Sequence, residues 1–71
     1  MAINRRLITD ADFEEAKAKQ ARLRVFRDDH IVEAGSVIVR FDDATVVLQS
    51  GVGDLAYHPR SACEFFELKR G

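Results

Sequence analysis

The residues of this chain best suited to chemistry are Cys63 and His58, which lie five positions apart with Glu64 and Glu67 close behind. A cysteine acts as a nucleophile when a positioned base forms its thiolate and a further group stabilises the oxyanion. A structural zinc ion needs four ligands, usually in closely spaced pairs. The chain has one cysteine, and its other histidine, His30, is far from the first. We therefore interpret Cys63 as a small buried hydrophobic residue and predict neither catalytic nor metal-binding residues.

Two further patterns match ligand-binding loops only in part. The segment 51–53 lacks the Lys-Ser/Thr pair of a phosphate-binding loop and the third glycine of a dinucleotide-binding loop, so we expect turn glycines there. The aspartates at 28–29, 42–43 and 54 do not follow the spacing of a calcium-binding loop. Aspartate side chains commonly accept hydrogen bonds from turn backbone, which explains them without a metal. The sequence therefore predicts no cofactor and favours a role other than that of an enzyme.

Basic residues are the strongest candidates for a binding role, because the charge is unevenly distributed. The net charge is −1, yet residues 1–27 hold seven Lys/Arg against four Asp/Glu, whereas residues 28–71 hold four against eight. On a helical wheel Lys17 and Arg24 lie together, while Lys19 and Arg22 lie apart from them among acidic residues. Binding of nucleic acid needs Lys/Arg concentrated on one face. This spacing therefore favours a solvated helix surface or an acidic protein partner over nucleic acid.

Aromatic residues supply the second set of candidates. One helix could leave some of them uncovered on a sheet face, and an uncovered apolar patch on a small protein usually marks a partner or dimer contact. A closed barrel that hides them all is the alternative. The candidate partner-binding residues are Arg5, Arg6, Lys17, Arg22, Arg24, Tyr57 and Phe65.

The first element that positions these residues is a helix predicted over residues 10–22. Thr9 can cap it, acidic residues fill its first turn, and basic residues follow toward its other end. Its apolar stripe is thin, so we expect it to dock through Phe13 and Leu23. Residues 23–27 could extend the helix, but their alternation and their β-branched and aromatic side chains favour a strand.

The central element is a β-hairpin predicted over Ser36–Ser50. If Asp42 and Asp43 form its turn, six apolar side chains share one face of the hairpin. The pairs that result are Phe41 with Ala44, Val39 with Val46, and Val37 with Leu48.

These elements predict an α+β protein in which an N-terminal helix precedes a small antiparallel sheet of four to five strands. A short strand at 55–58 ends before Pro59, which has no backbone N–H, and a helical turn at 59–62 leads to a last strand at 63–68. The order of elements over residues 23–68 resembles that of an SH3-like barrel, although no sequence motif carries the resemblance. We expect residues 1–8 to form a flexible arm and residues 9–71 to form the single small domain.

Composition sets the class of protein. A chain of 71 residues with 46% hydrophobic and 32% charged residues is expected to fold, although its core is small, and self-association to a homodimer could add stability. No apolar run approaches the ~20 residues of a membrane span, so we expect a cytoplasmic protein. We predict a small non-catalytic protein–protein interaction module, such as an adaptor, regulator or inhibitor that acts by steric contact. The alternative is a small nucleic-acid-binding barrel that uses the basic N-terminal region.

Overall fold

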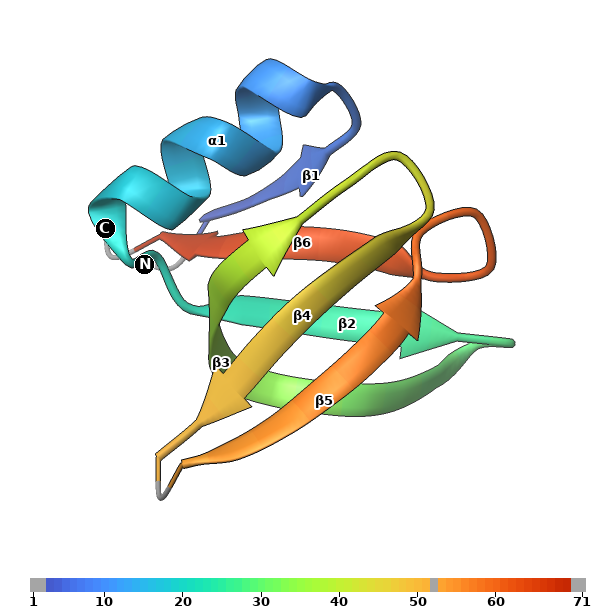
Figure 1. The fold of residues 1–71 in the computed structure, drawn as a ribbon. Coiled ribbons are helices and arrows are strands. Elements are labelled where there is room, and N and C mark those ends of the chain that lie inside the picture. The colour runs from blue at the N-terminus through green and yellow to red at the C-terminus, as the bar shows by residue number, and fades with distance from the viewer. Residues whose placement is uncertain (1–2, 52, 70–71) are drawn as a thin grey trace.

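A short helix and a strongly curved antiparallel sheet make up the fold in the computed structural model, which describes residues 3–51 and 53–69 (Figure 1). The strands follow the order β1-β6-β2-β3-β4-β5 across the sheet, and every neighbouring pair is antiparallel. The elements are β1 (Ile3–Leu7), α1 (Asp10–Lys19), β2 (Leu23–Arg27), β3 (His30–Phe41), β4 (Thr45–Ser50), β5 (Asp54–Pro59) and β6 (Glu64–Lys69).

The α+β class is confirmed, but the predicted number of strands is too low because the described residues form six strands. The additional strand is β1, which pairs with β6 in a segment where we expected a flexible arm. Within the described part of the chain, β1 and β5 are the edges of the sheet and no ladder joins them. The sheet is therefore open, and the SH3-like barrel is not confirmed.

Helix α1 starts as its sequence predicts and ends earlier. The backbone N–H of Asp12 donates to Thr9 Oγ1 over 3.2 Å, and Asp12 Oδ2 accepts from the N–H of Thr9 over 3.1 Å, which completes a capping box. The helix ends at Lys19 because Gln20 adopts a left-handed conformation with φ of 53°. Residues 23–27 are consequently free to form β2, as their alternation favours. None of the described residues belongs to a helix with the length and apolar character needed to cross a membrane.

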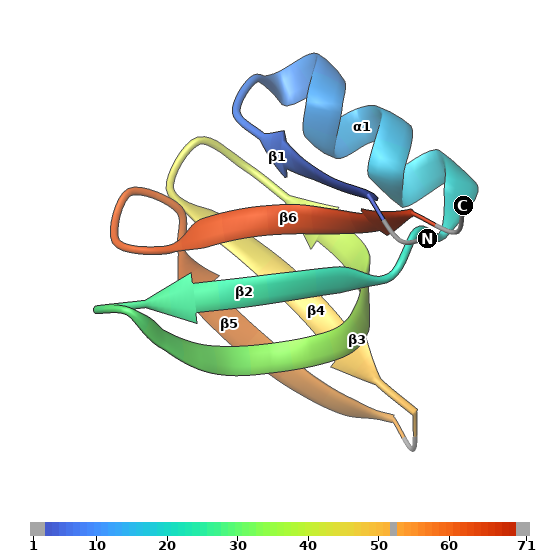
Figure 2. The ribbon, with the colours of Figure 1, turned by 180° about the vertical axis from the view of Figure 1, so that it is seen from behind.

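The path of β3 accounts for the curvature of the sheet. Its first half, as far as Ser36, pairs with β2 and its second half pairs with β4 (Figure 2). Gly35 is the extra residue at a register shift between Ala34 and Ser36, close to this change of partner, and its φ of +88° is a value that side-chain-bearing residues rarely adopt. The turn from β2 to β3 consists of Asp28 and Asp29, both with positive φ, as the favoured two-residue hairpin turn requires. The bent strand folds the sheet over, so that β4 and β5 cross in front of β2 and β6 in the view of Figure 1.

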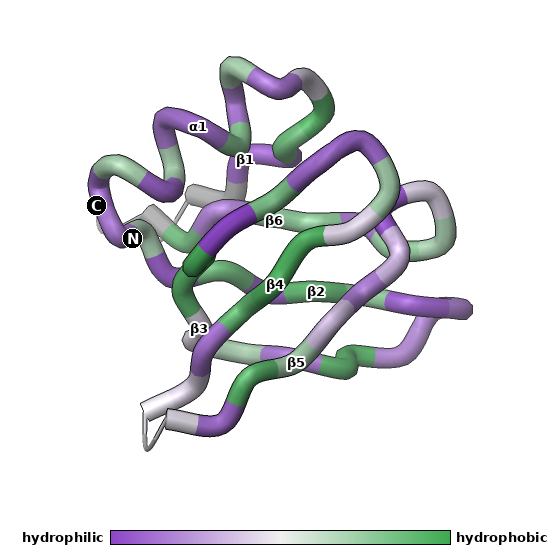
Figure 3. The backbone as a smooth tube through the Cα atoms, viewed as in Figure 1, coloured by the Kyte–Doolittle hydropathy of each residue, from purple (hydrophilic) through white to green (hydrophobic). Residues whose placement is uncertain are grey.

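The core lies inside this curve, beneath α1. Phe13 of the helix packs edge-to-face against Phe65 of β6 at 5.4 Å between ring centroids, and against Phe41 of β3 at 5.6 Å. We call the side of the sheet that faces this core the inner face and the opposite side the outer face. Hydrophobic stretches occupy the middles of β2 and β4, and hydrophilic residues occupy the turn between β2 and β3 (Figure 3). The core residues are Leu7, Phe13, Ala16, Leu23, Val25, Ile38, Val46, Leu48, Cys63 and Phe65.

The predicted register of the β3–β4 hairpin is wrong. Phe41 pairs with Val46 rather than Ala44, and a register shift separates Ile38 from Arg40. The turn is shifted by one residue from its predicted position, because the backbone N–H of Asp42 donates to the carbonyl of Thr45 over 2.9 Å and leaves Asp43 and Ala44 at the tip. The Oδ1 atom of Asp42 accepts hydrogen bonds of 2.8 Å from the backbone N–H groups of the two residues at 44 and 45. These hydrogen bonds also lower the pKa of the Asp42 carboxyl.

The register shift changes which side chains enter the core. Ile38 is fully buried and Phe41 packs against the core, although the two are three residues apart, so the bulge accommodates both Val39 and Arg40 at the surface. The expectation that Val37, Val39 and Phe41 share one buried face is therefore incorrect.

Candidate functional site

The outer face of β3, β4 and β5 gathers three of the six large apolar side chains that are exposed among the described residues, namely Val39, Leu55 and Tyr57. The strand register places Val47 of β4 between Arg40 of β3 and Tyr57 of β5. In the same way, Gln49 lies between two apolar residues, one on each neighbouring strand. We define the β3–β5 outer face by the residues Val37, Val39, Arg40, Val47, Leu55 and Tyr57.

Exposure along this face is high for apolar side chains. The exposed fractions are 60% for Tyr57, 50% for Leu55 and 43% for Val39. Val47 is only 4% exposed, yet it does not belong to the core cluster, so side chains of the outer face must cover it. A well-packed residue surrounded by exposed apolar neighbours is typical of the centre of a protein–protein interface.

A shallow hollow of about 320 Å³ opens on this face. Arg40 and Tyr57 stand on either side of Val47, and Thr45 and Asp42 complete its wall beside Phe41. Across residues 3–51 and 53–69, no ion pair engages the Arg40 guanidinium. The hollow therefore offers an apolar floor, one free cation and one phenol hydroxyl to a ligand.

The basic residues that the sequence singled out do not converge on this face. Arg5 points to the helix side, where its guanidinium contacts Glu15 at 2.9 Å and Glu67 at 3.6 Å. Lys19 of α1 reaches the same Glu67, which is buried, at 3.1 Å. The hydrogen bond to Glu15 raises the pKa of Arg5. Arg5 therefore connects β1, α1 and β6.

The other candidates are scattered over separate surfaces. Arg6 is exposed and lies 3.7 Å from Glu64, and Lys17 lies 3.5 Å from Glu14 on the helix. Arg22 lies just before β2, and Arg24 is the second residue of that strand. No ion pair within the described residues includes either arginine.

The two aromatic candidates have opposite environments. Phe65 is 2% exposed and belongs to the core, so it cannot touch a partner of the folded protein. Tyr57 lies on the β3–β5 outer face, and of the basic candidates Arg22 borders that face, because it lines a hollow together with Val37 and Gln49. Sequence reasoning missed Val39 and Arg40 because their orientation depends on the bulge, and it missed Leu55 although its alternation with Ala56 was a usable signal.

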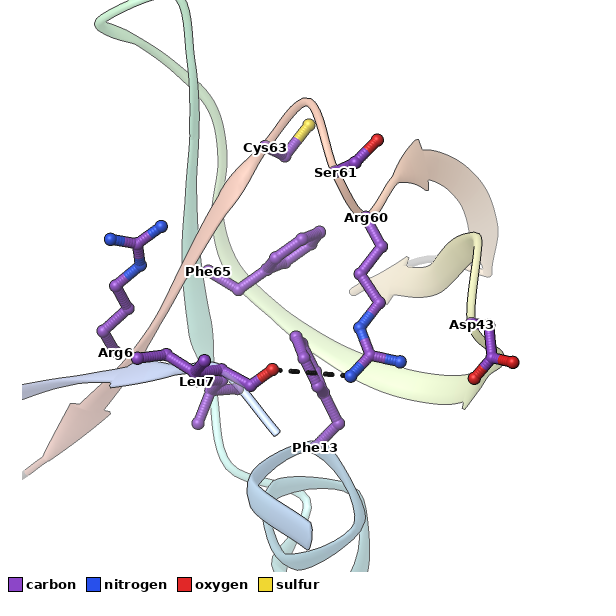
Figure 4. Close-up of a pocket in the computed structure, with 9 residues that line it drawn as sticks. Arg6, Leu7, Phe13, Asp43, Arg60, Ser61, Cys63 and Phe65 are labelled. Carbon is purple, nitrogen blue, oxygen red and sulfur yellow. Dashed lines mark hydrogen bonds between the residues drawn. The ribbon is translucent and has the colours of Figure 1, made fainter. Parts of the chain in front are cut away.

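Cys63 is one of the residues that line a second hollow, which has a volume of about 330 Å³ (Figure 4). Burial raises the pKa of the Cys63 thiol, which keeps it protonated near neutral pH. No histidine lines either hollow that Cys63 borders, so the structure does not bring His58 to this thiol. The residues around this hollow are Arg6, Leu7, Ile8, Phe13, Asp43, Arg60, Ser61, Cys63 and Phe65.

Arg60 lines this hollow, and its guanidinium is held by contacts with other residues of the fold. Its guanidinium lies 4.5 Å from the centre of the Phe13 ring and 2.7 Å from an Asp10 carboxylate oxygen. It also donates to the carbonyls of Asp42 at 2.9 Å and Ile8 at 3.5 Å, the latter drawn as the dashed line in Figure 4. Arg60 therefore joins the start of α1 to the β3–β4 turn and has little capacity left for a ligand.

His58 belongs to a polar cluster on the inner side of the sheet. Ser36 Oγ donates to Glu33 Oε1 over 2.7 Å, and the other carboxylate oxygen of Glu33 lies 3.4 Å from His58 Nε2. A hydrolytic triad would place the histidine between the serine and the carboxylate, whereas here the carboxylate is in the middle. The cluster instead links β5 to the first half of β3. Within the described residues, no group of three His, Cys, Asp or Glu side chains could hold a metal ion.

Comparison of the chain with protein-family models, with curated proteins and with solved structures finds no match.

Proposed function

We propose that this protein is a non-catalytic interaction module that binds another protein through the β3–β5 outer face. The observation that carries the proposal is the row of exposed Val39, Leu55 and Tyr57 around the covered Val47. Tyrosine and arginine are enriched at the centres of protein interfaces, because each offers a large contact area together with a polar group. Tyr57 and Arg40 are the two such residues here.

The chemistry of this face specifies a kind of partner. The apolar row needs an apolar surface opposite it, and the free Arg40 guanidinium needs a carboxylate at the rim of that surface. We therefore expect a partner whose contact surface combines aliphatic or aromatic side chains with at least one Asp or Glu.

The proposal is tested by comparing two matched variants as baits in affinity capture from the native host. Tyr57→Ser removes the most exposed apolar side chain of the face, while Ile8→Ser removes a similarly exposed apolar side chain from the loop before α1. A protein that binds the wild type and Ile8→Ser, and binds Tyr57→Ser at least tenfold less in quantitative mass spectrometry, supports the proposal. Equal capture by all three folded proteins overturns it.

Nucleic-acid binding is the second candidate, and one observation favours it. Arg24 lies on β2 beside Phe66 of β6, whose ring meets that of Phe26 edge-to-face at 5.7 Å. Cations interleaved with aromatic rings are the chemistry of single-strand binding. Fluorescence anisotropy with labelled single-stranded DNA and RNA tests it. Binding at low salt that falls steeply with added salt and is lost in Arg24→Gln would favour this function over the first.

The order of β2 to β6, with a turn at residues 60–62 before the last strand, also leads us to propose an opened relative of the SH3-like barrel. The resemblance concerns architecture alone and assigns no function. An experimental structure in which β5 pairs with β4 alone within its own chain, and β1 flanks β6, would support it.

A further inference from the structure

Strand β5 is an unprotected edge of the sheet. β4 is its only neighbour among the described strands, and β5 contains neither lysine nor arginine. The opposite edge, β1, carries Arg5 and Arg6 and lies beside α1 (Figure 1). Edge strands usually avoid pairing with other chains by carrying charges, prolines or bulges. The two such devices on β5 are Asp54 and Pro59, and they stand at the first and last positions of the strand, so its middle is unprotected.

The hydrogen-bond pattern with β4 identifies which backbone groups of β5 are free. Just beyond the paired residues, the N–H of Arg60 donates to the carbonyl of Ala44 over 2.8 Å. Hydrogen-bonded and non-hydrogen-bonded pairs alternate along an antiparallel ladder. His58, Ala56 and Asp54 therefore direct their backbone groups to β4, and the N–H and C=O groups of Leu55 and Tyr57 point to the open side.

We propose that β5 pairs antiparallel with β5 of a second copy of this chain, with Ala56 opposite Ala56 at the two-fold axis. In this register Leu55 of each copy faces Tyr57 of the other, and these are the residues whose backbone groups are free. Each of these two pairs forms two backbone hydrogen bonds, so four bonds join the copies. The inference concerns the backbone edge of β5 and does not rest on the proposed function.

Side-chain chemistry selects the same register. On the inner face, Asp54 of each copy lies opposite His58 of the other, so a second carboxylate approaches the imidazole that also lies 3.4 Å from Glu33 of its own chain. On the outer face, Leu55 meets Tyr57 twice, which joins two exposed apolar side chains at each contact. The strand is self-complementary about Ala56 in both charge and apolar character.

The neighbouring registers are poorer. A two-fold axis at Tyr57 would place Leu55 opposite Pro59, which has no N–H to donate. An axis at Leu55 would place Tyr57 opposite Gly53, whose N–H already donates to the carbonyl of Ser50 over 3.0 Å. A shift by one residue would oppose inner-face to outer-face residues. Only the axis at Ala56 uses all the free groups of the strand.

Cross-linking tests the register directly. In Ala56→Cys the two thiols would face each other across a non-hydrogen-bonded pair, where the Cα atoms are about 4.5 Å apart, a separation that suits a disulfide. We expect rapid oxidation of the Ala56→Cys protein to a covalent dimer under mild oxidant. The matched control is Leu55→Cys, whose two thiols would be offset by two residues, about 7 Å along the strand, and should cross-link at least tenfold more slowly. The wild type controls for the buried Cys63.

Sedimentation equilibrium tests the association itself. A contact limited to one strand and its neighbours is small, so we expect a concentration-dependent dimer with a dissociation constant in the range of roughly 10 µM to 1 mM. Tyr57→Pro removes an outward N–H without breaking the ladder to β4 and should abolish the dimer, whereas Tyr57→Ala keeps the N–H and should weaken it less. Circular dichroism reports whether each variant folds. If Tyr57→Pro does not fold, the two cysteine variants still decide the register.

A protein that stays monomeric at 1 mM, with no selective cross-linking of Ala56→Cys, overturns the inference. A dimer that forms equally well in folded Tyr57→Pro, or that cross-links faster through Leu55→Cys, overturns it too. Loss of partner capture by Tyr57→Ser with an unchanged monomer would support the proposed function alone.

Discussion

Phe13 is the residue whose loss should affect the fold most. It is fully buried, it is the largest apolar side chain on α1, and its ring contacts Phe65, Phe41 and the Arg60 guanidinium. Truncation of a buried phenylalanine to alanine costs about 3–5 kcal/mol through lost transfer energy and the cavity left behind. The lost aromatic and cation–π contacts act in the same direction, so we expect the upper part of that range.

This magnitude is comparable to the stability of the whole protein. At roughly 0.05–0.15 kcal/mol per residue, a chain of 71 residues has a free energy of unfolding of about 4–10 kcal/mol. Phe13→Ala should therefore leave the protein marginally folded or unfolded at 25 °C, whereas Phe13→Leu, which keeps most of the volume, should cost about 1–2 kcal/mol.

Urea unfolding followed by circular dichroism measures both values, because a domain of this size is expected to unfold in two states. Ile8→Ala is the matched control: it truncates an exposed apolar side chain near the same helix and should change the free energy of unfolding by less than about 0.5 kcal/mol. A cost below about 1.5 kcal/mol for Phe13→Ala would refute the placement of this ring at the centre of the core.

Three further predictions follow from local contacts. Thr9→Ala removes the cap of α1 and should lower the free energy of unfolding by about 0.5–2 kcal/mol in urea titrations. Thr9→Ser keeps the hydroxyl that accepts this hydrogen bond and should retain most of the wild-type stability. The pKa of Asp42 is lowered in the folded state, so its stabilising effect is present above the ordinary aspartate pKa of about 3.9 and is lost as the pH falls through the lower folded value. The melting temperature of the wild type should consequently drop more steeply below pH 4 than that of Asp42→Ala, and parallel pH profiles would contradict this. Cys63 is buried with a raised pKa, so a thiol reagent should label it only as fast as the protein opens, and addition of urea should accelerate labelling; immediate labelling of the folded protein would contradict its burial.

Local sequence signals predicted several elements correctly. Thr9 followed three residues later by Asp12 specifies the start of α1, because the two side chains satisfy backbone N–H groups at the helix end. The alternation in 23–27 predicted strand β2, and the last strand predicted at 63–68 corresponds to β6 at Glu64–Lys69. Each of these signals depends on neighbours within a few residues.

The candidate binding residues were predicted less well, because exposure is a property of the assembled sheet. Phe65 and Tyr57 are both aromatic residues in short strands, yet one lies in the core and the other on the surface. Arg5 was expected on a flexible arm, and it instead contacts Glu15 and Glu67 because β1 pairs with β6, which is about sixty residues away in the chain. Nothing in residues 1–8 alone indicates that pairing.

What the sequence by itself determined is the set of local elements: a capped helix, two-residue and aspartate turns, and strands of β-branched residues. What only the tertiary structure decided is the register of the β3–β4 hairpin and, with it, the face that the protein presents. Both Val37–Val39 and Val46–Leu48 are apolar at consecutive positions, so alternation cannot choose between the two faces. The choice follows from the hydrogen bonds of Asp42 and from the space beneath Phe13, which Ile38 and Phe41 fill while Val39 is left at the surface.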